Sequence, residues 1–292
     1  MSTTVAQSPP PATARPHETT RRPRRRRPPV VLAAAAVWGA VVLACCLLPQ
    51  VLAPGDPLAL HTDRVLQAPG GGTLLGADQF GRSVLALLVH GARQSVLIGA
   101  CSMILSVLLG GGLGLLAGYV GGRVDLLVGR LIDVLMCFPG ILLALIIAAA
   151  LGPSTRNVVI AVGIGHAPSF ARVMRGQVMS VRSRPYIEAA HATGLSHRQI
   201  VARHILPNSL APLVVLATIE VGSAIVSAAS LSFLGAGSSA GVPDWGRTIS
   251  DGQPYLSGAW WITTFSGLAL TLTVISLSLA GDWLRDRLDI TS

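Results

Sequence analysis

Long apolar segments alternate with short polar ones along this chain. A helix of about 20 apolar residues crosses a bilayer core of about 30 Å, and six segments meet that requirement. The sequence therefore predicts an all-α membrane protein with six transmembrane helices. Their expected bounds are 29–49, 95–119, 124–150, 157–176, 208–235 and 262–281. These segments are rich in Gly, Ala and Ser, which is typical of faces where helices pack closely within lipid.

The polar stretch between the fourth and fifth spans has the pattern of two short helices. Residues 185–192 suit a helix because the proline at their start has no N–H, and that N–H would have no partner in a first turn. Gly194 suits the left-handed position just after a helix end. Ser196 and Gln199 form a capping-box pattern, which predicts that a second helix starts there. Pro207 is expected to stop this second helix near the membrane surface.

Composition supports the membrane assignment and limits the chemistry. Of the 292 residues, 51% are hydrophobic and 12% are charged, which is about half the charged content of an average soluble domain. Arg accounts for all 22 residues of the Lys and Arg total. A P-loop and a Schiff-base mechanism both need Lys, so we predict no ATPase site and no Schiff-base chemistry here, and we assign no catalytic residue. The four cysteines have no metal-site spacing, and we predict no metal or cofactor.

The arginines predict the orientation of the chain. With the N-terminus inside, the cytoplasmic segments hold 16 arginines and the outer segments hold five. This asymmetry predicts that both termini are cytoplasmic and places the polar stretch in the cytoplasm as well. Residues 1–28 have few large apolar side chains and are predicted to be a disordered tail. We assign its Arg21–Arg27 run to orienting the first span, in preference to binding anionic lipid or nucleic acid.

Seven positions of the polar stretch form a motif with fixed spacing. They are Glu188, Ala189, Ala190, Gly194, His204, Leu206 and Pro207. The motif resembles the E-A-A-x3-G-x9-I-x-L-P loop of permease subunits in bacterial ABC importers, where a short cytoplasmic helix pair docks on the ATPase. The resemblance implies that these positions couple the chain to an ATPase. The histidine departs from the usual isoleucine, but Arg203–Asn208 is similar to the R-H-x-L-P-N of the peptide and nickel branch.

Other stretches are similar to the second, C-type permease of dipeptide, oligopeptide and nickel importers. The matching segments are Leu75–Arg82, Asp133–Gly140, Ser230–Gly235, Pro243–Gly246 and Gly281–Asp289. The resemblance implies the type I ABC importer permease fold in a multi-pass protein of the bacterial plasma membrane. It divides the chain into a tail (1–28), a first transmembrane helix (29–49), an extracytoplasmic segment (50–92), a permease domain (93–284) that contains a cytoplasmic coupling loop (177–207), and a cytoplasmic end (285–292).

The same resemblance implies several partners. The chain would form a translocation pathway for di- or oligopeptides together with a homologous permease. Two ATPase subunits would hold the ATP and Mg, and an extracytoplasmic binding protein would deliver the substrate. Membrane lipid would surround the chain, and nucleic acid is not expected as a partner.

Three ionisable residues inside the expected spans are candidates for the pathway, because charge at membrane depth is costly unless it is paired or near water. Asp133 follows Arg130 by three residues, so an intrahelical ion pair is the preferred interpretation for it. Glu220 has two interpretations of equal weight: it faces the pathway and a peptide's amino end, or it hydrogen-bonds a neighbouring helix. His166 either lines the pathway or forms a packed, hydrogen-bonded contact.

Two function classes stay open on the sequence alone. The first is an ABC importer permease that takes its energy from separate subunits. The second is a self-sufficient secondary transporter in which Asp133 or Glu220 carries a proton or ion. Inverted repeats would favour the second class, and none is evident. The motif around Glu188 favours the first.

Overall fold

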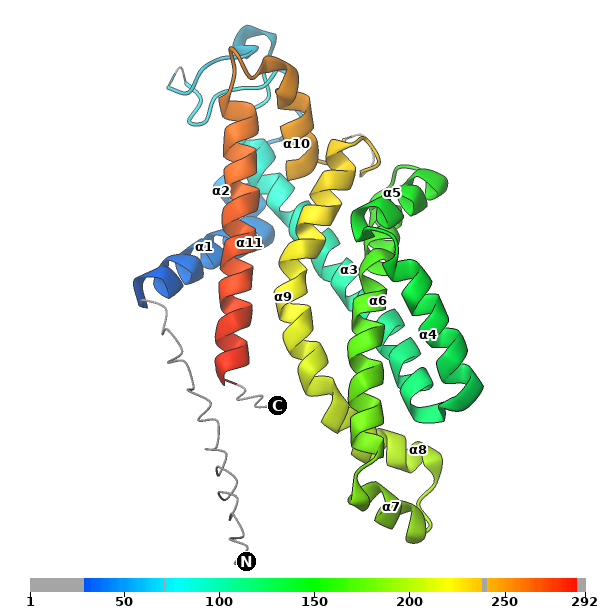
Figure 1. Ribbon diagram of the computed structural model, residues 1–292. Helices are drawn as coiled ribbons and strands as arrows, with labels where there is room; N and C mark the ends of the chain where they lie inside the picture. The colour runs from blue at the N-terminus through cyan, green and yellow to red at the C-terminus, as the bar shows by residue number, and fades with distance from the viewer. Residues whose placement is uncertain (1–28, 71, 238–240, 288–292) are drawn as a thin grey trace, which may run out of the picture.

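The computed structural model describes residues 29–70, 72–237 and 241–287, and in these ranges it is a bundle of helices without a β-strand (Figure 1). The expected tail at 1–28 lies outside the described residues. The long helices are α1 (Pro29–Leu47), α3 (Val84–Val120), α4 (Gly122–Met136), α5 (Gly140–Leu151), α6 (Thr155–Arg182), α9 (Leu206–Phe233) and α11 (Trp261–Arg287). The short elements are α2 (Pro49–Leu52), η1 (Thr62–Arg64), α7 (Pro185–Ala192), α8 (His197–Ile200), the π turn η2 (Val201–Ile205), α10 (Trp245–Gly252) and η3 (Gln253–Tyr255).

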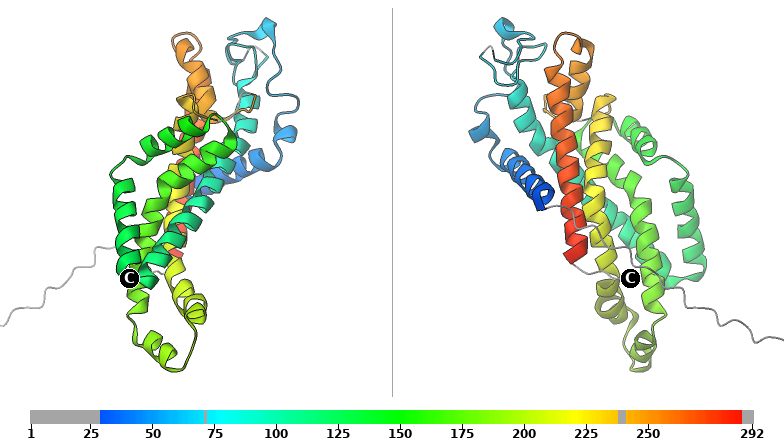
Figure 2. Two further views of the ribbon diagram at one scale, coloured as in Figure 1. Left: turned by 90° about the vertical axis from the view of Figure 1, so that its right-hand side faces the viewer. Right: turned by 60° about the vertical axis from the view of Figure 1, so that its left-hand side comes forward.

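The bundle has two distinct ends. Helices α7 and α8 project from one end, while α10 and the segment between α2 and α3 cover the other (Figures 1 and 2). Helix α3 has 37 residues, which makes it about 55 Å long at 1.5 Å per residue. It therefore extends through most of the bundle and connects the two ends.

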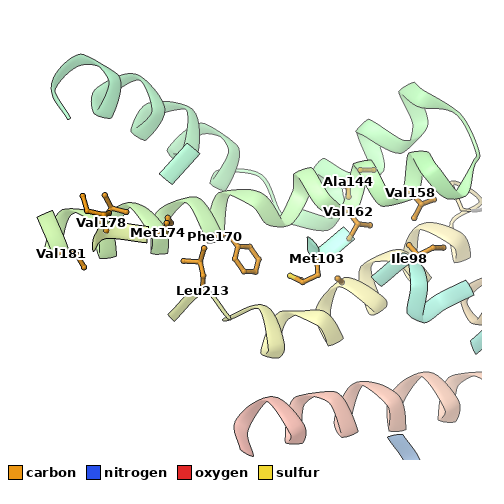
Figure 3. Close-up of a cluster of buried hydrophobic side chains, with 14 of the residues drawn as sticks. Ile98, Met103, Ala144, Val158, Val162, Phe170, Met174, Val178, Val181 and Leu213 are labelled. Carbon is orange, nitrogen blue, oxygen red and sulfur yellow. The ribbon is translucent and has the colours of Figure 1, made fainter. Parts of the chain in front are cut away.

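The main hydrophobic core lies between α3, α6 and α9. Phe170 and Met174 of α6 are buried against Met103 of α3 and Leu213 of α9 (Figure 3). The same cluster continues into the projecting helices through side chains that are almost fully buried, which are Ile187, Ile200 and Ile205. The projecting helices are therefore anchored in the same core as the bundle.

The helices differ in how well their length and composition suit a membrane span. Among the described residues, four helices are long and apolar enough to cross a membrane: α1, α3, α11 and the continuous helix from α8 to α9. The bent pair α4 and α5 would be a fifth. Helix α6 has 28 residues, but it is less apolar because it carries polar and charged side chains. The count of six spans remains a prediction.

The expected helix over 124–150 is wrong as a single straight element. Helices α4 and α5 replace it and meet at an angle of 92°. Pro139 lies directly before α5, where it cannot donate a backbone hydrogen bond and disfavours helical geometry in Phe138. Two other helices are longer than expected: α3 starts at Val84 rather than near 95, and α6 continues to Arg182.

The segment before α3 folds around a buried carboxylate. Asp78 is 1% exposed and accepts hydrogen bonds from the backbone N–H of Phe80 (2.9 Å) and of Arg82 (2.8 Å) and from the Arg82 guanidinium (2.5 Å). The indole N–H of Trp261, in the first turn of α11, donates to the Ala77 carbonyl oxygen at 3.1 Å. The Leu75–Arg82 stretch is thus a compact turn that ties this segment to α11.

Helices α3 and α6 approach closely along a stripe of small residues. Gly110, Gly114 and Gly118 are buried on one face of α3, and a Cβ at any of them would collide with an α6 carbonyl oxygen. One turn earlier, the Ser106 hydroxyl donates to the Gly163 carbonyl oxygen at 2.8 Å. Spacing of four residues places this stripe on a single helix face, as expected for close packing in lipid.

We predict that Gly114→Leu destabilises the protein, because the new side chain would separate α3 from α6. Overpacking of this kind costs about 1–3 kcal/mol, and sometimes more. Gly112→Leu is the matched control, since Gly112 is exposed and has no atom within 4 Å of an added Cβ. Thermal unfolding of the purified protein, followed by tryptophan fluorescence, should show a lower midpoint for Gly114→Leu. Equal midpoints for the two variants would contradict the role of the stripe.

Candidate functional site: a projecting helix pair and a polar cluster

The first projecting helix, α7, has defined signals at both ends. Pro185 occupies its first turn, as the sequence predicted. Gly194 has φ +81°, and its N–H donates to the His191 carbonyl oxygen at 3.0 Å, while the Leu195 N–H donates to the Ala190 carbonyl oxygen at 3.2 Å. These two bonds are those of a Schellman motif, which requires a left-handed residue at the glycine. The expected helix and glycine turn are confirmed.

The second projecting helix, α8, begins with the expected capping box. The Gln199 N–H donates to the Ser196 hydroxyl oxygen at 3.4 Å, and the Ser196 N–H donates to the Gln199 side-chain oxygen at 2.9 Å. Both backbone donors are thereby satisfied at a helix start. The α7–α8 helix pair, residues 185–200, is consequently held in one shape by local hydrogen bonds.

The expectation that Pro207 ends the second helix is wrong. The chain stays helical from His197 to Phe233, with the π turn η2 placed just before the proline. Proline lacks an N–H and crowds the carbonyl group four residues earlier, and a π turn is one way for a helix to absorb such a defect. The Leu206 N–H bonds to the Val201 carbonyl oxygen. Helix α8 is therefore a continuous helical extension of α9, and the glycine turn joins α7 to it.

The seven motif positions divide between an outer and an inner face. Glu188, Ala189, Gly194 and Pro207 are exposed. Ala190 is buried and belongs to the core cluster. The two remaining positions, His204 and Leu206, are partly buried. The exposed positions are available for docking, whereas Ala190 faces the protein interior.

Two of the three pathway candidates contact each other between α6 and α9. His166 Nδ1 lies 3.3 Å from a carboxylate oxygen of Glu220, and His166 Nε2 lies 3.2 Å from the Ser227 hydroxyl oxygen. The side chains of His166 and Glu220 are 17% and 28% exposed. An acid, an imidazole and a hydroxyl thus form a polar cluster that remains partly accessible. Such a cluster can bind a cationic group or exchange hydrogen bonds with a polar ligand.

The third candidate, Asp133, lies apart from this cluster. Its carboxylate contacts Arg172 of α6 at 3.3 Å, and the pair with Arg130 that the spacing favoured is not formed within the described residues. Asp125, two turns earlier on α4, forms a two-point ion pair with Arg175. These residues line an open cavity of about 620 Å³ between α4 and α6. The expected intrahelical pair is replaced by pairs between helices.

Sequence reasoning missed the partners of these charges rather than the charges themselves. Glu220 has no basic residue nearby in its own helix, and its partner lies 54 positions earlier on α6. Arg172 and Arg175, which belong to the 16 arginines assigned to the cytoplasmic segments, lie within helix α6. A sequence signal does exist, since they recur three residues apart, but it does not indicate which helix they face.

A family comparison covers most of the chain. Residues 110–290 match the model of the binding-protein-dependent transport system inner membrane component. The chain is 42% identical over 224 residues to the dipeptide transport system permease protein DppC of Alkalihalophilus pseudofirmus, covering 77% of this chain and 74% of that protein. It is 39% identical to the glutathione transport system permease protein GsiD of Pectobacterium atrosepticum, covering 78% and 75%.

Solved structures give the same fold. A chain from the inward-facing MetNI methionine ABC transporter superposes with a TM-score of 0.57 at 20% sequence identity. The match covers 69% of this chain and 95% of the other. At this identity the likeness concerns the fold alone, which is that of type I ABC importer permeases.

We predict that Glu220→Leu weakens the contact between α6 and α9, because His166 loses its acidic partner. Hydrogen bonds between membrane helices contribute about 0.6–1.7 kcal/mol, so the unfolding temperature of the purified protein should fall. Glu220→Gln keeps a side-chain oxygen for the imidazole and should retain more stability. Ser230→Ala is the control, since that hydroxyl donates to Val226 of its own helix. A loss in Ser230→Ala as large as in Glu220→Leu would contradict this role.

Proposed function

Because this chain belongs to the family of binding-protein-dependent transport system inner membrane components, we propose that it is the C-type permease of a peptide importer. In the type I ABC fold it is a multi-pass protein of the bacterial plasma membrane, and ATP is hydrolysed by a separate component. Its proposed substrates are di- or oligopeptides. The names of its relatives support this class, since they refer to dipeptide, di/tripeptide and glutathione transport.

The proposed assembly contains this chain, a homologous permease, two ATPase subunits and an extracytoplasmic binding protein. The observation that carries the proposal is the α7–α8 helix pair. It projects from the bundle, exposes Glu188, Ala189 and Gly194, and continues into α9 without a break in helical structure. A rigid projection of this kind transmits a displacement instead of absorbing it.

The coupling step is proposed to be mechanical. ATP binding closes the ATPase dimer, and the docked helix pair moves with it. Because the pair is capped internally and fused to α9, its displacement shifts α9 and the residues it carries. Glu220 is one of those residues, so its distance from His166 of α6 changes as the pathway opens outward. Alternating access follows from relative movement of α6 and α9.

The polar cluster is the proposed contact for substrate within the membrane. The carboxylate of Glu220 suits the protonated amino end of a peptide, because opposite charge compensates for lost hydration at membrane depth. His166 contacts this carboxylate through Nδ1, and the Ser227 hydroxyl fixes the orientation of the imidazole through Nε2. Asp133, paired with Arg172 on a different face of α6, is given no part in substrate contact.

Reconstitution tests this function against the ion-coupled alternative. The purified chain alone in liposomes should neither hydrolyse ATP nor accumulate a dipeptide. Adding the second permease and the ATPases should restore ATP-dependent uptake, with the binding protein needed for the full rate. In the full complex, Glu220→Gln should lower uptake while basal ATP hydrolysis persists. Uptake by the single subunit on a proton or sodium gradient would overturn the proposal.

We predict that Gly194→Asp abolishes transport and ATPase docking while the chain still inserts into the membrane. The left-handed backbone at this turn costs a non-glycine residue about 1–2 kcal/mol, which is a local effect, whereas a charged side chain would obstruct the docking surface. The measurement is co-purification of the ATPases together with dipeptide uptake.

Gly235→Asp is the matched control for this prediction. Gly235 also follows a helix end, with φ +83° and open space around an added Cβ, but it lies at the opposite end of α9. It should retain ATPase docking. Normal docking and uptake in Gly194→Asp would refute the assignment of the helix pair to coupling.

A further inference from the structure

A hydrogen bond joins α3 to the projecting helix pair. The Tyr119 hydroxyl oxygen lies 2.7 Å from Nδ1 of His197. Tyr119 is in the last turn of α3, and His197 is the first residue of α8. The two residues are 78 positions apart, so the bond is a tertiary contact between elements that are not consecutive in the chain.

Two further ring contacts lie beside this bond, which is exposed to solvent. The Arg182 guanidinium lies over the Tyr119 ring at 5.9 Å from its centroid, within reach of a cation–π contact. The His191 ring meets the His197 ring edge to face, with centroids 5.4 Å apart. The contact therefore gathers side chains from α3, α6, α7 and α8 at one point.

The backbone joins the helix pair to α6 and α9 but not to α3. The helix pair is covalently continuous with α6 on one side and with α9 on the other. Helix α3 is not, because it leads into α4 through Gly121 and Gly122. A displacement of the pair reaches α6 and α9 through the backbone. It reaches α3 directly through this side-chain contact and indirectly through the face that α3 shares with α6.

The far end of α3 is bound to α10. The backbone N–H of Trp245 donates to the Ser95 hydroxyl oxygen at 3.2 Å, and its indole N–H donates to the Leu88 carbonyl oxygen at 3.0 Å. Trp245 is 2% exposed, so this contact is firmly packed. Helix α3 thus has a specific contact to the helix pair at one end and to α10 at the other.

We propose that Tyr119 is a positioning residue that couples the helix pair to α3, and through α3 to the α10 end of the molecule. The inference rests on the proposed function, in which the ATPase meets the helix pair on the cytoplasmic side and the binding protein is extracytoplasmic. We place the binding protein at the α10 end because that end is opposite the helix pair (Figure 1). In this proposal, contact of the binding protein with the α10 end affects ATP hydrolysis through α3. The Tyr119–His197 bond connects α3 to the helix pair.

The test uses the complete complex in lipid nanodiscs, with ATP hydrolysis measured with and without binding protein. Tyr119→Phe removes the hydroxyl and keeps the ring. We expect normal assembly, normal basal hydrolysis and a three- to tenfold smaller stimulation by the binding protein, the order expected from losing one hydrogen bond. His197→Leu should lower the ratio of stimulated to basal hydrolysis to a similar extent, and combining the two should add little.

Two variants separate this role from general damage. His197→Asn places an amide near the position of Nδ1 and should restore much of the stimulation. Tyr186→Phe removes a phenol from the same helix pair but keeps the ring that lies beside His204, and it should behave as the wild type. Stimulation that survives in Tyr119→Phe, or that falls equally in Tyr186→Phe, would overturn the proposal.

Co-purification of the ATPases shows whether the Tyr119–His197 bond serves docking instead. If Tyr119→Phe loses the ATPases during purification and Tyr186→Phe does not, the bond serves docking, and the link through α3 is wrong. Failure of the proposed function is read separately, from Gly194→Asp. Unchanged docking in that variant would remove the ATPase from the helix pair, whatever the result at Tyr119.

Discussion

Lipid supplies no hydrophobic force between helices, so the approach of α3 to α6 has to come from close van der Waals contact and from hydrogen bonds between helices. The stripe of small residues from Ser106 to Gly118 provides both. It sets the position of α6, and α6 in turn presents His166 to α9 and two arginines to α4. The polar contacts of the bundle therefore depend on a face that carries no charge.

The charged contacts described for α4, α6 and α9 join two helices rather than two turns of one helix. Glu220 contacts His166, and Asp125 contacts Arg175, across helix boundaries. A charge that is removed from water is costly unless it has a partner, so these contacts make the separation of α6 from α4 and from α9 costly in free energy. A movement that separates such a pair costs free energy. A substrate or water molecule that replaces the lost partner reduces this cost.

The features that sequence reasoning identified correctly are local ones. The helix over 185–192, the turn at Gly194 and the capping box at Ser196 each depend on residues within a few positions, where backbone hydrogen bonding leaves few alternatives. The partners of Glu220 and Asp133 depend on which helices pack together, and local sequence patterns do not show this. A proline such as Pro139 predicts a helix break, but the length and apolar content of 124–150 favour a single span. Pro207 does not end the second helix because the π turn relieves its clash with the preceding turn.

That π turn also determines the direction in which the helix pair points. Ile200 and Ile205 are both fully buried although they are five residues apart, and on a regular α-helix that separation would turn them about 140° away from each other. The wider turn shifts the helical phase between α8 and α9, which brings the two side chains onto one face. The direction in which α8 leaves α9 is therefore determined by backbone hydrogen bonding within five residues, and not by the side chains that contact a partner.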